Sequence, residues 1–271
     1  MKILKSLFEF YLKSSLHVSF AVWALYKISF ISLNSTEMPY LDWLVFTSSI
    51  VGYNIIKFGS IFIKNKKLIS KSIILVTFFA LAVGLWCFFY LDFLTQSVFI
   101  LCFILVILYI IPNPSLNKNL RNLNGVKIFL VAFSWTLVSY VSLINRMSTF
   151  EISLCIILGV QRFIFVLVAT IPFEIRDIKI DKNDLGTLPQ RFGIFKSKIL
   201  GLLLLILNTC LFYFIIDFHF IFMLLEVFIY FILGFFLLIS NANQPLNFTR
   251  FWIEGIPVFW IFILSILNQL F

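Results

Sequence analysis

The sequence predicts an all-α membrane protein, a bundle of about nine transmembrane helices, and two observations lead to that fold class. The first is composition: of 271 residues, 62% are hydrophobic and only 12% are charged, with a mean hydropathy of +1.07. A water-soluble globular chain carries roughly 25% charged and 45–50% apolar residues, so lipid must be the solvent for most of this chain. The second is that apolar stretches of membrane-spanning length recur along the whole sequence.

Each crossing of the bilayer needs about 20 apolar residues in a helix. Stretches of about that length fall at 14–33, 41–63, 72–91, 94–111, 125–144, 150–172, 197–216, 219–240 and 251–270. Only two residues separate the third stretch from the fourth, so we expect a tight helical hairpin there. No linker, repeat or low-complexity tract divides the chain, and residues 1–271 are therefore predicted to form a single domain.

The basic residues orient this bundle. With the N-terminus in the cytoplasm, most of the 21 Lys and Arg residues fall on inner segments, whereas Arg146 is the basic residue of the outer loops. Cytoplasmic loops carry the excess of Lys and Arg, which predicts that orientation. It also explains the net charge of +9 without nucleic acid as a partner. The bias toward Lys, Asn, Ile and Phe is typical of an AT-rich genome and favours a bacterial inner membrane.

One inner segment, residues 173–196, is long and holds much of the charge of both signs. Four carboxylates recur in it at i, i+3, i+7 and i+10, namely Glu174, Asp177, Asp181 and Asp184. On a helix this spacing places them within about an 80° arc, with Arg176 and Lys179 on other sides. Such a stripe suits Mg²⁺, which takes carboxylate oxygens and commonly keeps waters and phosphates. The alternative is an interfacial helix whose acidic side is solvated.

The run from Glu174 to Gly193 resembles the second aspartate-rich motif of the UbiA superfamily of intramembrane prenyltransferases. That motif reads approximately D-x-x-D-x-x-x-D, then a small turn, T-L-P and a Gly. Asp177 and Asp181 match its central pair, and Glu174 replaces the leading Asp. The tail is matched by Thr187, Leu188, Pro189 and Gly193. The resemblance extends to the whole chain. The family's architecture, a nine-helix bundle with the N-terminus inside and acidic motifs after the second and sixth spans, is similar to the topology predicted here.

The first motif of the family is largely missing. Its pattern, roughly N-D-x-x-D-x-x-x-D, has its best counterpart in the second span, where only Asn54 survives and carboxylates are replaced by Ile55, Phe58 and Phe62. Lys57 lies in the same stretch. We expect Lys57 to supply positive charge that a first-motif Mg²⁺ would otherwise provide, leaving one metal ion. An alternative of equal weight is that Lys57 extends its amine to the inner interface.

The resemblance implies an integral-membrane prenyltransferase that moves an isoprenyl group from an isoprenyl diphosphate to an unidentified, lipophilic or aromatic acceptor. It implies Mg²⁺ on Glu174, Asp177 and Asp181. Asn54 would orient the diphosphate, and the candidate phosphate contacts are Lys127, Lys182 and Arg191. Asp177, Asp181 and Lys57 are the expected catalytic residues. The alternative is a catalytically degenerate homologue that acts as a lipid-binding or regulatory membrane protein.

Two further charged residues lie inside predicted spans. Arg162 is near the middle of the sixth span, and Glu226 is in the eighth. A charge within the bilayer is costly unless it is paired or faces a cavity. We therefore expect these two residues to form a buried ion pair or to line a cavity inside the bundle.

Overall fold

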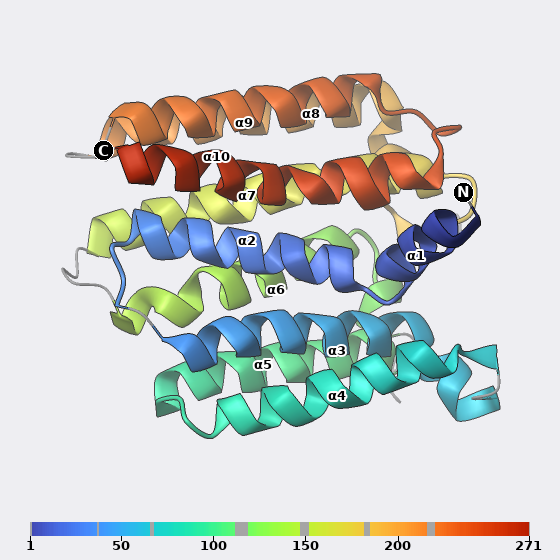
Figure 1. The fold of residues 1–271 in the computed structure, drawn as a ribbon. Coiled ribbons are helices and arrows are strands. Elements are labelled where there is room, and N and C mark those ends of the chain that lie inside the picture. The colour runs from blue at the N-terminus through green and yellow to red at the C-terminus, as the bar shows by residue number, and fades with distance from the viewer. Residues whose placement is uncertain are drawn as a thin grey trace.

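The computed structural model describes residues 2–36, 38–65, 68–111, 119–146, 152–181, 185–215 and 220–270. These residues build an all-helical bundle whose long helices run alongside one another (Figure 1). The α-helices are α1 (Lys2–Lys13), α2 (Leu16–Ser32), α3 (Pro39–Asn65), α4 (Lys71–Phe88), α5 (Phe93–Ile110), α6 (Lys127–Ser139), α7 (Ile152–Asp177), α8 (Leu188–Cys210), α9 (Phe220–Ile239) and α10 (Glu254–Leu270). Short segments η2 (Leu120–Asn122), η3 (Val141–Arg146), η5 (Leu211–Phe214) and η6 (Phe248–Ile253) connect or extend them.

Seven helical segments of the described chain are long and apolar enough to cross a membrane. The pair α1 and α2, bent by 57°, makes an eighth if it is counted as one span. Each predicted apolar stretch overlaps a helix, but the number of nine crossings and the cytoplasmic N-terminus stay predictions. The seventh stretch was placed too late, because α8 already begins at Leu188.

The expected hairpin between the third and fourth stretches is present. Asp92 lies between α4 and α5, and one oxygen of its carboxylate accepts a hydrogen bond from the backbone N–H of Thr95 at 3.1 Å. A side chain that accepts a hydrogen bond from an unpaired backbone N–H of the first turn is a typical N-cap. This cap ends the apolar run and starts α5 as a separate helix.

Apolar side chains fill the interior and also cover much of the outer surface. The larger core cluster joins α2, α7, α9 and α10 around Phe165, Ile171 and Trp260. A second cluster joins α2 with α3, α5 and α6 around Tyr26 and Leu41. Exposed Phe and Leu side chains lie on the outside of α4, α5 and α9, which is the distribution that a lipid environment permits.

Polar side chains gather at one end of the bundle, which we call the site end. It consists of α1, the start of α6, the end of α7, the start of α8 and the start of α10 with η6. Here α8 is kinked at Gly193, whose φ is +80°. That backbone region favours glycine, which explains the residue type at the last position of the T-L-P…G tail.

Candidate functional site

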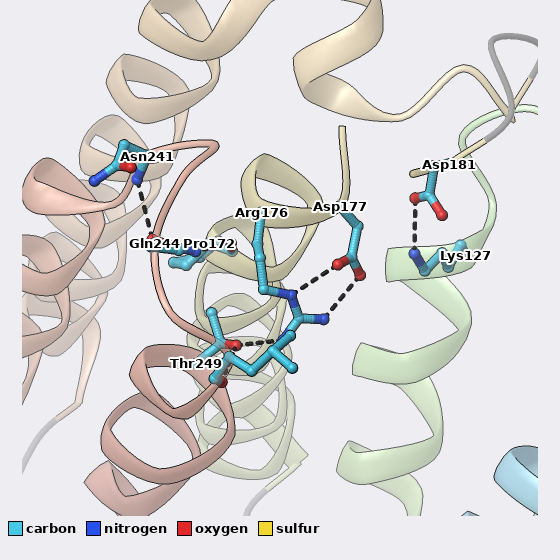
Figure 2. Close-up of polar contacts among 9 residues, drawn as sticks. Lys127, Pro172, Arg176, Asp177, Asp181, Asn241, Gln244 and Thr249 are labelled. Atoms are coloured by element: carbon cyan, nitrogen blue, oxygen red, sulfur yellow. Dashed lines mark hydrogen bonds and ion pairs between the residues drawn. The ribbon is translucent and has the colours of Figure 1, made fainter. Parts of the chain in front are cut away.

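Lys127 and Asp181 form an ion pair at the site end. The amine of Lys127, in the first turn of α6, donates to Oδ2 of Asp181 at 3.2 Å, as Figure 2 shows. Both side chains are mostly but not fully buried, with 19% and 12% exposed. The two residues predicted as phosphate contact and metal ligand therefore do lie together, and an anion that enters here meets a partly accessible ammonium group.

Arg176 holds the other central carboxylate of the motif. Its Nε and Nη2 donate to the two oxygens of Asp177 at 2.7 and 2.9 Å, and its Nη1 donates to the hydroxyl of Thr249 on η6. Figure 2 shows the fork from Arg176 to Asp177 and the contact of Arg176 with Thr249. The expectation that Arg176 points away from the acidic residues was wrong, because a long, planar guanidinium reaches back to its own neighbour and binds it in a bidentate manner.

Glu174 is buried and faces the start of α8. Only 2% of the residue is exposed, and its Oε2 accepts the backbone N–H of Leu188 at 3.0 Å. The first N–H groups of a helix have no partner within it, so Glu174 caps α8 from another helix. Nearby, the backbone N–H of Thr187 donates to Oε1 of Gln190 at 3.2 Å. The T-L-P turn is therefore fixed directly against α7.

The predicted acidic stripe along one helix is not formed. Helix α7 ends at Asp177, and the chain turns there, with the N–H of Asp181 donating to the carbonyl of Asp177 at 2.8 Å. Asp181 thus reaches the site from a turn and not from a helical face. Lys182 and Asp184, also predicted here, lie outside the described residues.

The acidic side chains of the site end suit a Mg²⁺ ion that takes only one or two carboxylates from the protein. Among the residues that the structure describes, no three His, Cys, Asp or Glu side chains form a ready metal cluster. The three acidic residues are nevertheless close enough to interact electrostatically: Glu174 with Asp177 and Asp181. Mg²⁺ usually binds one or two carboxylates and completes its shell with waters and substrate phosphates. The residues fit such an ion and do not form a three-carboxylate cage.

Asn54 and Lys57 reach the bend between α1 and α2. The amide of Asn54 donates to the carbonyl of Ser14 at 3.1 Å and to the hydroxyl of Thr77 at 2.9 Å, and its Oδ1 accepts from Ser15 at 2.7 Å. The amine of Lys57 donates to the same Ser15 hydroxyl at 3.0 Å. Because Asn54 is buried and both of its amide hydrogens are used, the observed contacts hold the bend. Its predicted role toward a diphosphate stays a prediction.

Lys57 also faces a carboxylate of the last helix. Glu254 interacts electrostatically with Lys57, Arg250 and Arg176, yet it lies more than 4.0 Å from the Lys57 amine. The Lys57 ammonium has three N–H donors and uses one of them on the Ser15 hydroxyl, so donors remain for a ligand. Arg176 and Arg250 were missed as site residues, although Arg250 directly precedes the last predicted apolar stretch, residues 251–270.

Arg191 lies over the turn before α8. A side-chain carbon at Gly186, whose φ is +56°, would come within 2.8 Å of the Nε of Arg191 and of the Oδ1 of Asn124. The backbone N–H of Gly125 donates to the carbonyl of Leu185 at 2.9 Å. The segments before α6 and α8 therefore pack closely, and Arg191 is exposed at their surface, where its guanidinium can meet an anion.

An apolar cavity of about 410 Å³ adjoins the site end. Residues of α2, α3, α4, α5 and α6 line it, and two of them connect it to the charged groups. Tyr109 is within electrostatic range of Asp181 and Glu174, and Tyr53 is within range of Glu254. The indole N–H of Trp135 donates to the hydroxyl of Tyr53 at 2.6 Å. A ligand with a charged head and an apolar chain is matched by this arrangement.

Comparisons with known sequences give no match: no family model and no curated protein matches this chain.

Solved structures are similar in fold. A structure described in work on digeranylgeranylglyceryl phosphate synthase in membranes has a TM-score of 0.58 and 16% identity, covering 97% of this chain and 98% of its own. A UbiA homologue from Aeropyrum pernix K1 has a TM-score of 0.61 and 12% identity, covering 91% and 97%. A UbiA homologue from Archaeoglobus fulgidus bound to GPP and Mg²⁺ has a TM-score of 0.57 and 15% identity, and the match covers 92% of this chain and 95% of its own. These likenesses show the fold over nearly the whole length of each chain.

Proposed function

We propose that this chain, a membrane-helix bundle with the UbiA fold, is a prenyltransferase that moves an isoprenyl group from an isoprenyl diphosphate to a lipophilic or aromatic acceptor. The observation that carries the proposal is that Tyr53 and Tyr109, which line the apolar cavity of about 410 Å³, lie within electrostatic range of the carboxylates of the site end. A diphosphate and an isoprenoid chain need those two environments side by side. A structural neighbour bound to GPP and Mg²⁺ supports the same assignment.

The diphosphate would lie between α3, α6, α7 and the start of α10. Lys127 and Lys57 present ammonium groups there, and Arg176 is held in place by Asp177 and Thr249. Ion pairs and hydrogen bonds to these cations stabilise the charge that develops on the leaving diphosphate. Arg191, at the exposed edge, and Lys182, outside the described residues, remain proposed phosphate contacts.

Mg²⁺ is the proposed cofactor. Asp181 and Asp177 would hold it, with diphosphate oxygens completing its shell. When bound, it supplies Lewis-acid stabilisation of the departing diphosphate. Glu174 contributes negative charge near the ion and keeps the T-L-P turn in place through Leu188.

The transfer itself exchanges one bond for another. The bond between the allylic carbon and the diphosphate oxygen breaks, and its electron pair leaves with the diphosphate. The acceptor forms the new bond to that carbon and releases a proton. Glu254, opposite Lys57 across a gap wider than 4.0 Å, is the proposed base that receives this proton. Its carboxylate is within electrostatic range of Tyr53, which lines the apolar cavity.

A bacterial inner membrane, with the N-terminus on the cytoplasmic side, is the proposed location. The alternative function is lipid binding without catalysis by a degenerate homologue. The loss of the first acidic motif favours this alternative. The second motif argues against it, because its carboxylates Asp177 and Asp181 are still placed against cations at the site end.

The test is binding of a series of non-reactive isoprenyl thiolodiphosphates to the purified protein in detergent, with and without Mg²⁺. Wild type is compared with Asp177→Asn/Asp181→Asn. The control is Asp42→Asn, which removes a carboxylate that pairs with Lys27 at 2.6 Å on the opposite end of the bundle. Binding that depends on Mg²⁺ and is lost only in the double variant supports the proposal. Absence of binding to a folded wild type would favour the degenerate homologue.

A further inference from the structure

A second polar cluster lies inside the bundle, away from the site end. Arg162 on α7 and Glu226 on α9 are each 6% exposed. The hydroxyl of Tyr230 donates to Oε2 of Glu226 at 2.9 Å, and the guanidinium carbon of Arg162 lies 5.0 Å from the centre of the Trp260 ring. The two opposite charges attract each other electrostatically.

The two charges do not touch. No nitrogen of Arg162 lies within 4.0 Å of a carboxylate oxygen of Glu226. Nε and Nη1 of Arg162 are buried and have no hydrogen-bond partner among the described residues, and the same holds for Oε1 of Gln161. A buried donor without an acceptor costs free energy, because nothing replaces the water it has lost. A further polar group is therefore needed between these side chains.

A small cavity lies at this position. Besides Arg162 and Glu226, its lining includes Gln161 and the hydroxyl-bearing residues Ser29 and Tyr140. The cavity offers about 10 Å³ to the centre of a water-sized sphere. One buried water needs roughly 10–15 Å³ on that measure and two to four polar partners. The cavity satisfies both conditions and is too small for an organic ligand.

We propose that one water molecule occupies this cavity and bridges Arg162 to Glu226. The water accepts a hydrogen bond from Nε or Nη1 of Arg162 and donates one to the carboxylate of Glu226. Its second hydrogen is available to Oε1 of Gln161, which otherwise has no donor. A halide ion in the same place would face the Glu226 carboxylate, so the charge pattern selects a neutral ligand.

This water fixes the helix that carries the acidic motif. Arg162 precedes Glu174 on α7 by a distance of about 18 Å along the helix axis. The bridge ties α7 to α9, and the Trp260 contact ties it to α10. The rotation of α7 is thereby set in the middle of the bundle by a contact that involves no residue of the site end. The inference is independent of the proposed function.

The direct experiment is a structure of the full chain in a lipid nanodisc at a resolution that shows ordered water. We expect one density peak within hydrogen-bond distance of both Arg162 and Glu226. The pair Lys27 and Asp42, in direct contact at 2.6 Å, is the internal control and should show no water between its charges. A direct Arg162–Glu226 contact, an empty cavity or density larger than a water would overturn the proposal.

A thermal unfolding cycle gives a second, independent readout. Arg162→Met and Glu226→Met each leave one buried charge alone and should lower Tm by about 6 °C or more. The double variant removes both charges and should recover most of that loss. Additive losses would contradict the bridge. If a single methionine variant fails to fold, Glu226→Gln replaces it, and it should lose less Tm than Arg162→Gln because its amide still accepts from the water.

Discussion

Lys127 and Asp181 lie 54 residues apart in the sequence and meet at 3.2 Å between the start of α6 and the turn that follows α7. This pair joins a cation to the acidic motif at the point where Tyr109 lines the apolar cavity. A diphosphate bound here would exchange an ion pair within the protein for an ion pair with the ligand. The pair is therefore the structural basis of the first prediction.

Lys127→Met should weaken the binding of an isoprenyl thiolodiphosphate by about tenfold or more, because a charge-assisted contact to the phosphate is lost. Lys13→Met is the matched control, since Lys13 is an exposed lysine of α1 paired with Glu9 at 3.2 Å. Isothermal titration in the same detergent measures both. Equal affinities for wild type and Lys127→Met would exclude Lys127 from the diphosphate site.

Arg176→Lys should behave as a non-conservative change. A lysine keeps the charge but cannot hold both oxygens of Asp177 and the hydroxyl of Thr249 at once. We expect diphosphate affinity to fall several-fold and its dependence on Mg²⁺ concentration to shift, since Asp177 is no longer held. Thr249→Val isolates the contact to η6. A Mg²⁺ titration curve unchanged in Arg176→Lys would show that the fork does not organise the metal ligand.

Gly52→Leu should restrict binding to isoprenyl diphosphates with shorter chains. Gly52 lines the apolar cavity, and an added side-chain carbon would lie 3.8 Å from Val106, so a longer side chain extends into the space. We expect affinity for long-chain diphosphates to fall by about tenfold or more, with little change for the shortest. Gly59→Leu on the same helix, outside the cavity lining, is the control. A uniform loss over all chain lengths would argue that the chain lies elsewhere.

Asn54→Ala should destabilise the protein by about 2–4 kcal/mol, because two buried hydrogen bonds at the α1–α2 bend and one to Thr77 of α4 lose a partner. Asn54→Asp keeps the acceptor for Ser15 but turns a charged oxygen toward the carbonyl of Ser14, and because that charge is buried this variant should lose at least as much stability as Asn54→Ala. Thermal unfolding measures the order. A loss of diphosphate binding with unchanged Tm would instead favour the role predicted from the sequence.

Most helices could be placed from the sequence, because a membrane-spanning helix is a long apolar run with few charges. The end of α7 was not. The spacing of Glu174, Asp177 and Asp181 continues a helical period, so the sequence favoured one helix. The chain instead turns after Asp177, where the T-L-P segment packs against Glu174. That tertiary contact leaves no periodic signal in the sequence.

The pairing of charges was predicted only in part. Periodicity placed Arg176 away from Asp177, but side-chain length and the fork of the guanidinium decide that contact. Asn54 was recognised as the remnant of a motif, whereas its hydrogen bonds to Ser14 and Thr77 depend on a bend that composition cannot reveal. Arg162 and Glu226 were expected to form a buried ion pair or to line a cavity; they line a small cavity without a direct ion pair. The gap between them depends on packing at the scale of a single water molecule.

Transfer of a labelled isoprenyl group tests the central claim most directly. Membranes that contain the overproduced protein are incubated with an isoprenyl diphosphate labelled in its chain, with Mg²⁺, and the lipid extract is analysed by mass spectrometry. The account predicts a labelled product other than the free alcohol, formed in wild type and in Asp42→Asn but lost in Asp177→Asn/Asp181→Asn. Label that stays in the diphosphate or its alcohol in every sample, with the protein folded, would contradict it.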